Sequence, residues 1–154
     1  MHYMVRWADR TDWTPAVKMI WRTFLAAEGK TASPEAIRNF FELLTADALY
    51  EAFLKGTYPM VIAADGDKII GAGTLRSGNV ISLLFVDEAH QHQGVGRALL
   101  SCLCERAVLH KQTTLRVKAL PSAEPFYHKS GFEVTGPRME YRGILVTEMQ
   151  KQLK

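Results

Sequence analysis

The sequence has no long apolar run. Nothing in it approaches the roughly 20 consecutive apolar residues that a membrane-spanning helix needs. Its first ten residues, MHYMVRWADR, contain no apolar segment like that of a secretory signal peptide. We therefore expect no membrane partner and a cytoplasmic location.

Cysteine is scarce and basic runs are absent. The two cysteines, Cys102 and Cys104, point to different faces of the helix expected there, so free thiols in a reducing compartment are predicted. The five histidines show no ligand spacing, and no metal is expected. The 19 basic and 16 acidic residues are dispersed, so the net charge of +3 is attributed to solubility, with no nucleic-acid partner.

The remaining composition, 47% hydrophobic and 23% charged, is typical of a globular protein. A chain of 154 residues can bury one core and is short for two, so a single domain over residues 1–154 is expected.

The order of expected elements indicates an α/β fold built on a mixed sheet. Strands over 60–64, 68–76 and 80–86 follow one another on tight turns, which predicts an antiparallel meander. A helix over 95–110 then leads to a strand over 115–119, which is expected to run parallel to its predecessor. The other expected elements are a strand over 3–8, helices between 15 and 56, a short helix over 122–129, and strands over 132–135 and 144–150 joined across Gly136-Pro137.

Residues 91–98, QHQGVGRA, lie between the strand ending at 86 and the helix beginning at 95. Glycines at 94 and 96 would let the backbone approach a ligand closely, and the free N–H groups of the first helical turn favour phosphate oxygens. The same pattern also occurs in plain tight turns. A Walker loop would need Gly-Lys-Ser/Thr where the chain has Gly-Arg-Ala, and a dinucleotide fingerprint would need a third glycine.

The spacing of Gln91, Gly94 and Gly96 resembles the pyrophosphate loop of the GNAT superfamily of N-acetyltransferases, which reads Gln or Arg, two residues, Gly, one residue, Gly or Ala. The element order is also similar to the GNAT fold, in which two parallel strands splay apart and admit the pantetheine arm of acetyl-CoA. The resemblance implies acetyl-CoA as co-substrate and helices on both faces of the sheet. The implied cofactor-binding residues are Leu84, Phe85, Val86, Gln91, His92, Gln93, Gly94, Val95, Gly96, Arg97 and Ala98.

The segment from Ala123 to Phe132 resembles a second GNAT signature, Ala-x-x-Phe/Leu-Tyr-x-x-x-Gly-Phe. Tyr127 falls on the tyrosine that protonates the departing thiolate in that family. The pKa of a phenol, about 10, is close enough to that of a thiol, about 8.5, for this proton transfer. The alternative is a tyrosine that only packs its ring under the helix.

One position departs from the family pattern. Lys118 occupies the slot where many relatives have an asparagine that contacts pantetheine, so Ser122 or the backbone alone would have to replace that contact. An oxyanion would be met by the N–H of Val86 or Phe85, and Arg97 or Lys129 would reach a phosphate or simply be solvated.

No general base identifies itself. The candidates are Asp87, Glu88, Glu42, Glu140 and His90, each of which is also compatible with a solvated surface position. The aromatic residues of the first helices are expected to be mainly core, with one or two touching substrate: Trp13, Trp21, Phe24, Phe40, Phe41, Tyr50 and Phe53.

The sequence therefore predicts an N-acetyltransferase that moves the acetyl group of acetyl-CoA directly to a primary amine, a small molecule more readily than a protein. No cysteine falls at a nucleophile position, which favours direct attack. A homodimer is compatible with the sequence. The alternatives are a non-catalytic acyl-CoA-binding module, which would bind the cofactor without turnover, and a small basic nucleic-acid-binding domain.

Overall fold

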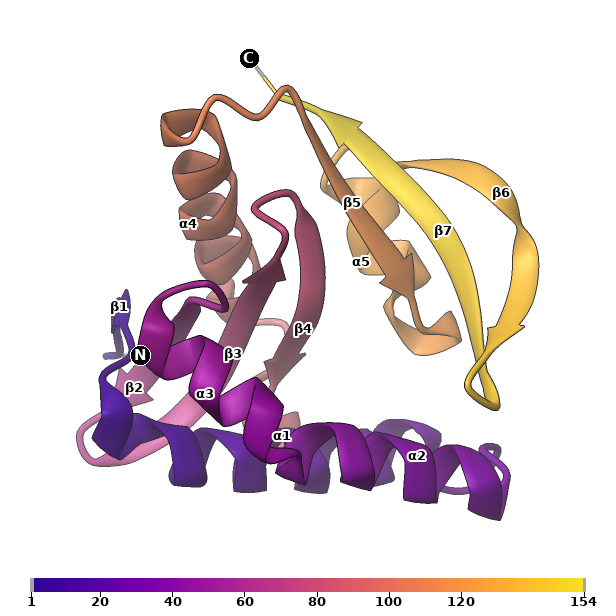
Figure 1. Cartoon of the computed structure of the whole chain (residues 1–154), viewed down its shortest axis with the longest axis horizontal. Coiled ribbons are helices and arrows are strands. Elements are labelled where there is room, and N and C mark those ends of the chain that lie inside the picture. The colour runs from indigo at the N-terminus through magenta and orange to yellow at the C-terminus, as the bar shows by residue number, and fades with distance from the viewer. Residues whose placement is uncertain (1, 154) are drawn as a thin grey trace.

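One mixed sheet organises the computed structural model, which describes residues 2–153 (Figure 1). The order across the sheet is β1-β2-β3-β4-β5-β7-β6. Among the strands of residues 2–153, only β4 and β5 pair in parallel, and every other neighbouring pair is antiparallel. The strands are β1 (Met4–Trp7), β2 (Met60–Asp65), β3 (Lys68–Arg76), β4 (Val80–Val86), β5 (Thr114–Ala119), β6 (Glu133–Tyr141) and β7 (Ile144–Gln152). The expected meander and the parallel crossover are both confirmed.

Helices cover both faces of this sheet, as expected. They are α1 (Trp13–Glu28), α2 (Pro34–Thr45), α3 (Asp47–Lys55), α4 (Val95–Leu109) and α5 (Glu124–Lys129). The core on one face contains residues of α1, α2 and α3, and the core on the other contains residues of α4 and α5. None of the helices in residues 2–153 combines the length and the apolar character needed to span a bilayer.

Local signals set the helix ends. The Ser33 hydroxyl accepts a hydrogen bond from the Ala36 N–H at 3.0 Å, and Pro34 occupies the first helical position of α2. Gly56 ends α3 in the left-handed conformation, at φ +83°. A serine N-cap followed by proline, and a glycine after the last helical residue, are common sequence signals for the start and end of a helix.

β4 and β5 separate soon after they begin. Val80 lies opposite Arg116 and Ile81 opposite Val117, and no further pair forms. A bulge in β4 accompanies the separation: Leu75 of β3 opposes Ile81 while the adjacent Thr74 opposes Leu83, so Ser82 is the extra residue. Because a bulge bends its strand and increases the local twist, it turns the end of β4 away from β5 (Figure 1).

The predicted connection across Gly136-Pro137 is wrong. β6 continues through both residues to Tyr141, with a register shift against β7 between Val134 and Arg138. Proline is tolerated there because β6 is the edge strand of the sheet and the pairing is irregular. The chain reverses instead at Arg142-Gly143, where both residues have positive φ.

Candidate active site

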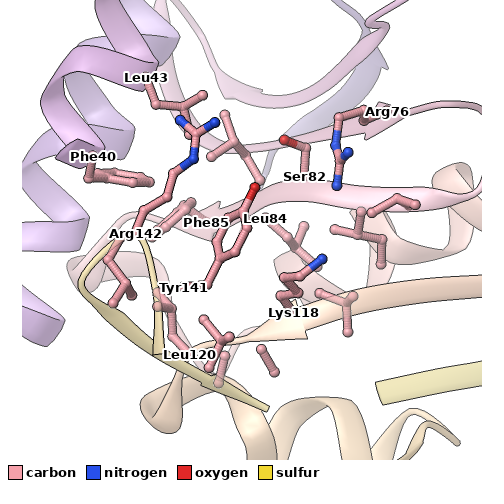
Figure 2. Close-up of a pocket in the computed structure, with 18 of the residues that line it drawn as sticks. Phe40, Leu43, Arg76, Ser82, Leu84, Phe85, Lys118, Leu120, Tyr141 and Arg142 are labelled. Carbon is pink, nitrogen blue, oxygen red and sulfur yellow. The ribbon is translucent and has the colours of Figure 1, made fainter. Parts of the chain in front are cut away.

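A cleft of ≈ 280 Å³ lies where β4 and β5 separate (Figure 2). Its walls come from β4 and β5, and further residues are supplied by α2, α5 and the turn between β6 and β7. The splayed strand pair therefore forms a pocket that several distant segments complete.

The edge of β4 that faces this cleft has backbone groups without a strand partner. The N–H groups of Asp87 and Leu83 bond to oxygen atoms of β3 at 2.8 and 3.1 Å. Successive residues of a strand point their N–H and C=O groups to opposite edges. The backbone groups of Phe85 therefore also point to β3, whereas those of Leu84 and Val86 point to the gap. Of the two amides expected at an oxyanion, only that of Val86 points to the gap.

β5 contributes to the gap in the same way. The Arg116 N–H donates to the carbonyl of Asn79 at 2.8 Å, which fixes the edge of β5 that faces β4. Two residues later, Lys118 presents its N–H and C=O to the same side, beyond the last paired residues. Both sides of the gap therefore offer backbone groups without a strand partner to an extended ligand.

The loop before α4 leaves the beginning of that helix open. Gly94 is the N-cap at φ +84° and no side chain caps the helix, so the first-turn N–H groups of Val95, Gly96 and Arg97 have no helical partner. The Gln91 side chain donates to the Val86 carbonyl at 2.9 Å, which ties this loop to the end of β4. The open helix end therefore lies at the same end of β4 as the gap.

The two glycines of the loop serve different purposes. A Cβ on Gly94 would meet no heavy atom within 4 Å, so only the left-handed backbone requires glycine there. A Cβ on Gly96 would lie 3.1 Å from Cε1 of Phe126 in α5, so this glycine allows α4 and α5 to pack closely. The sequence predicted a close approach to a ligand for both.

Tyr127 lines the cleft from α5 and is 4% exposed. Its ring packs edge-on against Phe126 and Phe132, at centroid distances of 5.3 and 5.2 Å. Burial raises the pKa of the phenol above its ordinary value, so the hydroxyl is a neutral proton donor. Tyr127 therefore packs in the core and also lines the cleft.

Residues 28–153 match the family model of the acetyltransferase (GNAT) domain. The chain belongs to the GNAT acetyltransferase family. No curated protein matches the sequence.

Solved structures resemble the GNAT fold of this chain along nearly its whole length. A GCN5-related N-acetyltransferase of Rhodopseudomonas palustris has a TM-score of 0.85 at 20% identity, covering 99% of this chain and 97% of that one. The PaiA N-acetyltransferase of Thermoplasma acidophilum, in complex with coenzyme A, has 0.81 at 15%, covering 99% of each. YncA of Salmonella typhimurium, with acetyl-CoA, has 0.73 at 23%, covering 100% and 95%. At these identities the likeness shows the fold.

None of the five candidate bases lines the cleft of this GNAT domain. Asp87 is 7% exposed and has three basic side chains around it: His90 Nδ1 lies at 2.9 Å, Arg22 at 3.3 Å and Lys68 at 3.8 Å. Burial raises the pKa of Asp87, but the hydrogen bonds from His90 and Arg22 and the charge of Lys68 outweigh it and lower the pKa overall. Asp87 is thus a poor proton acceptor, and it links β4 to α1 and β3.

Other predicted residues divide between the cleft and the rest of the molecule. Lys118 lines the cleft, whereas Ser122 donates to Glu28 and is not a lining residue. Arg97 and Lys129 are exposed. Of the seven aromatic residues considered for substrate contact, only Phe40 lines the cleft.

Glu124 anchors α5, and no sequence pattern predicts this role. Its carboxylate accepts hydrogen bonds from Arg138 at 2.6 Å and Thr147 at 2.9 Å, which fasten the helix carrying Tyr127 to β6 and β7. Burial raises the pKa of Glu124, and the bonds from Thr147 and Arg138 more than offset this and lower it. No group of three or more His, Cys, Asp or Glu within residues 2–153 is arranged to hold a metal ion.

Proposed function

We propose that this protein is a single-domain N-acetyltransferase that uses acetyl-CoA as co-substrate and passes the acetyl group directly to a primary amine. The carrying observation is the early separation of β4 and β5. It leaves Leu84, Val86 and Lys118 without a strand partner on the side of the gap, beside the N-terminus of α4, which no side chain caps. These groups suit an amide-containing arm followed by a pyrophosphate, which is the chemistry of coenzyme A.

Each part of the binding site has a defined task in this proposal. Acetyl-CoA, when bound, supplies an activated thioester. Leu84 and Val86 hold the pantetheine arm through their backbones, and Phe85 contributes its side chain, which lines the cleft. The helix dipole and the free N–H groups at the start of α4 favour the pyrophosphate. The loop residues assigned to it are Gln91, His92, Gln93, Gly94, Val95, Gly96, Arg97 and Ala98.

Tyr127 is the proposed general acid. Its phenol is neutral, and its ring is held by two aromatic neighbours at the wall of the cleft. A thiolate leaving into the same buried space is also disfavoured as an anion, because desolvation raises its pKa as well. Burial therefore raises the pKa of the proton donor and that of the proton acceptor in the same direction.

Direct transfer is supported by the position of the thiols. Cys102 and Cys104 lie on α4 and no cysteine lines the cleft among the described residues. Burial is the main cause that raises the pKa of both. Because the thiolate is the nucleophile, neither thiol suits an acyl-enzyme.

The acceptor is proposed to be a small molecule. The turn between β6 and β7 closes one side of the cleft, and it is fastened to α2 by the hydrogen bond from the Asn39 side chain to the Arg142 carbonyl at 2.7 Å. A protein segment would have to displace this turn. The cytoplasmic location and the homodimer stay predictions.

The test is calorimetric titration with acetyl-CoA, followed on the same sample by thiol release across a panel of amines. Micromolar binding with amine-dependent thiol release supports the enzyme. Binding without release for any amine would favour the non-catalytic acyl-CoA-binding module. No binding of acetyl-CoA, together with salt-dependent binding of DNA or RNA, would contradict the proposal.

A further inference from the structure

The charged residues that line the cleft, within the described part of the chain, are all of one sign. Arg76 lies at the end of β3, Lys118 in β5 and Arg142 in the turn after β6, and each lines the cleft. Among the described residues that line it there is no aspartate or glutamate. Three separate elements thus bring cations to one pocket, and no described residue adds an acidic side chain to its lining.

These cations are not paired with carboxylates of residues 2–153. The ion pairs of that region use other side chains. Lys118 and Arg142 contact the ring of Tyr141 instead, at 5.0 and 5.7 Å from its centroid. A cation–π contact leaves the hydrogen-bond donors of both cations available to an anion.

Ser82, the extra residue of the β4 bulge, adds a directed donor. The Leu83 N–H donates to the Thr74 hydroxyl at 3.1 Å, Thr74 donates to the Tyr58 hydroxyl at 2.9 Å, and Tyr58 donates to Ser82 at 2.8 Å. In this series of hydrogen bonds, the protons of Leu83 N–H, Thr74 and Tyr58 are all donated within the series. The Ser82 hydroxyl accepts the last of these bonds, so its own proton is available to a group in the cleft. The bulge therefore brings a hydroxyl donor into the lining of the pocket.

The charge of Arg76 influences the same group of hydroxyls. Burial raises the pKa of Tyr58, and the positive charge of Arg76 is among the influences that oppose the rise. In Figure 2 the polar ends of Arg142, Tyr141, Ser82 and Arg76 gather along one side of the cleft. Guanidinium groups beside a hydroxyl donor form a typical binding arrangement for a carboxylate or phosphate.

We propose that the acceptor amine also carries an oxyanion, a carboxylate or a phosphate, which Arg76, Arg142 and Ser82 hold in the cleft. This inference rests on the proposed acetyl transfer. Polycationic acceptors are disfavoured because like charges repel. The cations also disfavour the protonated form of a bound amine. This helps to supply a neutral nucleophile in a cleft to which residues 2–153 contribute no carboxylate base.

The test is calorimetric binding of matched amines to the protein loaded with coenzyme A. The pairs are an amino acid with its C-terminal amide, to probe a carboxylate, and phosphoethanolamine with ethanolamine, to probe a phosphate; spermidine and kanamycin are the polycations. We expect the anionic member of at least one pair to bind about tenfold more tightly than its partner, as for hydrogen bonds to charged groups. Arg76→Gln and Arg142→Gln should each remove most of that preference, while Arg38→Gln, on the exposed face of α2, should not.

Three results would overturn the inference: equal or tighter binding of the uncharged or polycationic amines, no binding of any anionic amine, or a loss of coenzyme A affinity in the two arginine variants with the amine preference intact. Thiol release is measured separately with acetyl-CoA. An anionic amine that binds with preference but is never acetylated would contradict the proposed function and leave the oxyanion site standing.

Discussion

The hydroxyl of Ser122 donates a hydrogen bond to the carboxylate of Glu28, 94 residues earlier in the chain. Glu28 is the last residue of α1 and is 8% exposed, while Ser122 lies between β5 and α5. The contact therefore connects the helical layer on one face of the sheet to the segment that leads into the helix carrying Tyr127.

Ser122→Ala should lower the free energy of unfolding by about 1–2 kcal/mol, because a buried carboxylate loses its partner. In a Glu28→Gln background the same change should cost about 0.5 kcal/mol, since the hydrogen bond then joins two neutral groups. Urea unfolding of the four proteins measures this coupling. Ser101→Ala, on the exposed side of α4, is the control, and equal costs in both backgrounds would contradict the assigned contact.

The sequence predicted the elements that local signals define. The strands expected over 68–76 and 80–86 match β3 and β4, because tight turns mark their ends. The bulge at Ser82 was not predicted, since it depends on how β4 pairs with β3 and leaves no local pattern. The contact of Glu28 with Ser122 and the cations that meet in the cleft were missed because they join residues far apart in the sequence.

The reversal of β6 and β7 was misplaced for a related reason. Gly136-Pro137 is a turn signal in local terms, but pairing with β7 holds both residues within β6. For the site, Tyr127 and the loop residues were named through the family resemblance. Five candidate bases were chosen by residue type alone, and the fold places all of them away from the cleft lining.

Gly94→Ala should weaken acetyl-CoA binding. A left-handed alanine costs about 1–2 kcal/mol, and relaxing this strain moves the first-turn N–H groups of α4 away from the phosphates. Gly66→Ala is the matched control, because Gly66 also has positive φ and open space around its Cα but lies in the turn between β2 and β3. Both variants should lose similar stability on urea unfolding, and calorimetry should detect weaker binding for Gly94→Ala alone. Equal affinities would remove the loop from the cofactor site.

Tyr127→Phe should lower kcat about 100-fold, at the lower end of the range for general acid catalysis, with little change in the affinity for acetyl-CoA. Because burial raises the pKa of this phenol above about 10, it stays protonated through neutral and mildly basic pH. The ratio of variant to wild-type kcat should therefore be constant from about pH 6 to about pH 9. Tyr50→Phe, which removes a hydroxyl outside the cleft, is the control. An unchanged kcat would leave Tyr127 with a packing role.

Asp87→Asn should lower the free energy of unfolding by about 1–3 kcal/mol at neutral pH, because Arg22, Lys68 and His90 lose their shared anion. The folded-state pKa of Asp87 is lowered, so its contribution is present above the unfolded value of about 3.9 and is lost as the pH falls through the folded value. The difference between wild type and variant should therefore shrink below about pH 4. Urea unfolding over this range, with Asp67→Asn in an exposed turn as the control, measures it, and a difference that grows in acid would have the wrong sign.

Asn39→Ala should affect the amine and leave the cofactor alone. The Asn39 side chain holds the carbonyl of Arg142 at 2.7 Å, which fixes the turn that carries Arg142 into the cleft. Losing one hydrogen bond of about 1 kcal/mol corresponds to a rise of about fivefold in KM for the amine. Steady-state thiol release gives this KM, and calorimetry gives the affinity for acetyl-CoA, which should not change. Glu42→Gln is a suitable control because Glu42 is exposed on the same helix. A parallel loss of acetyl-CoA affinity would mean that the turn supports the whole cleft and not the acceptor side alone.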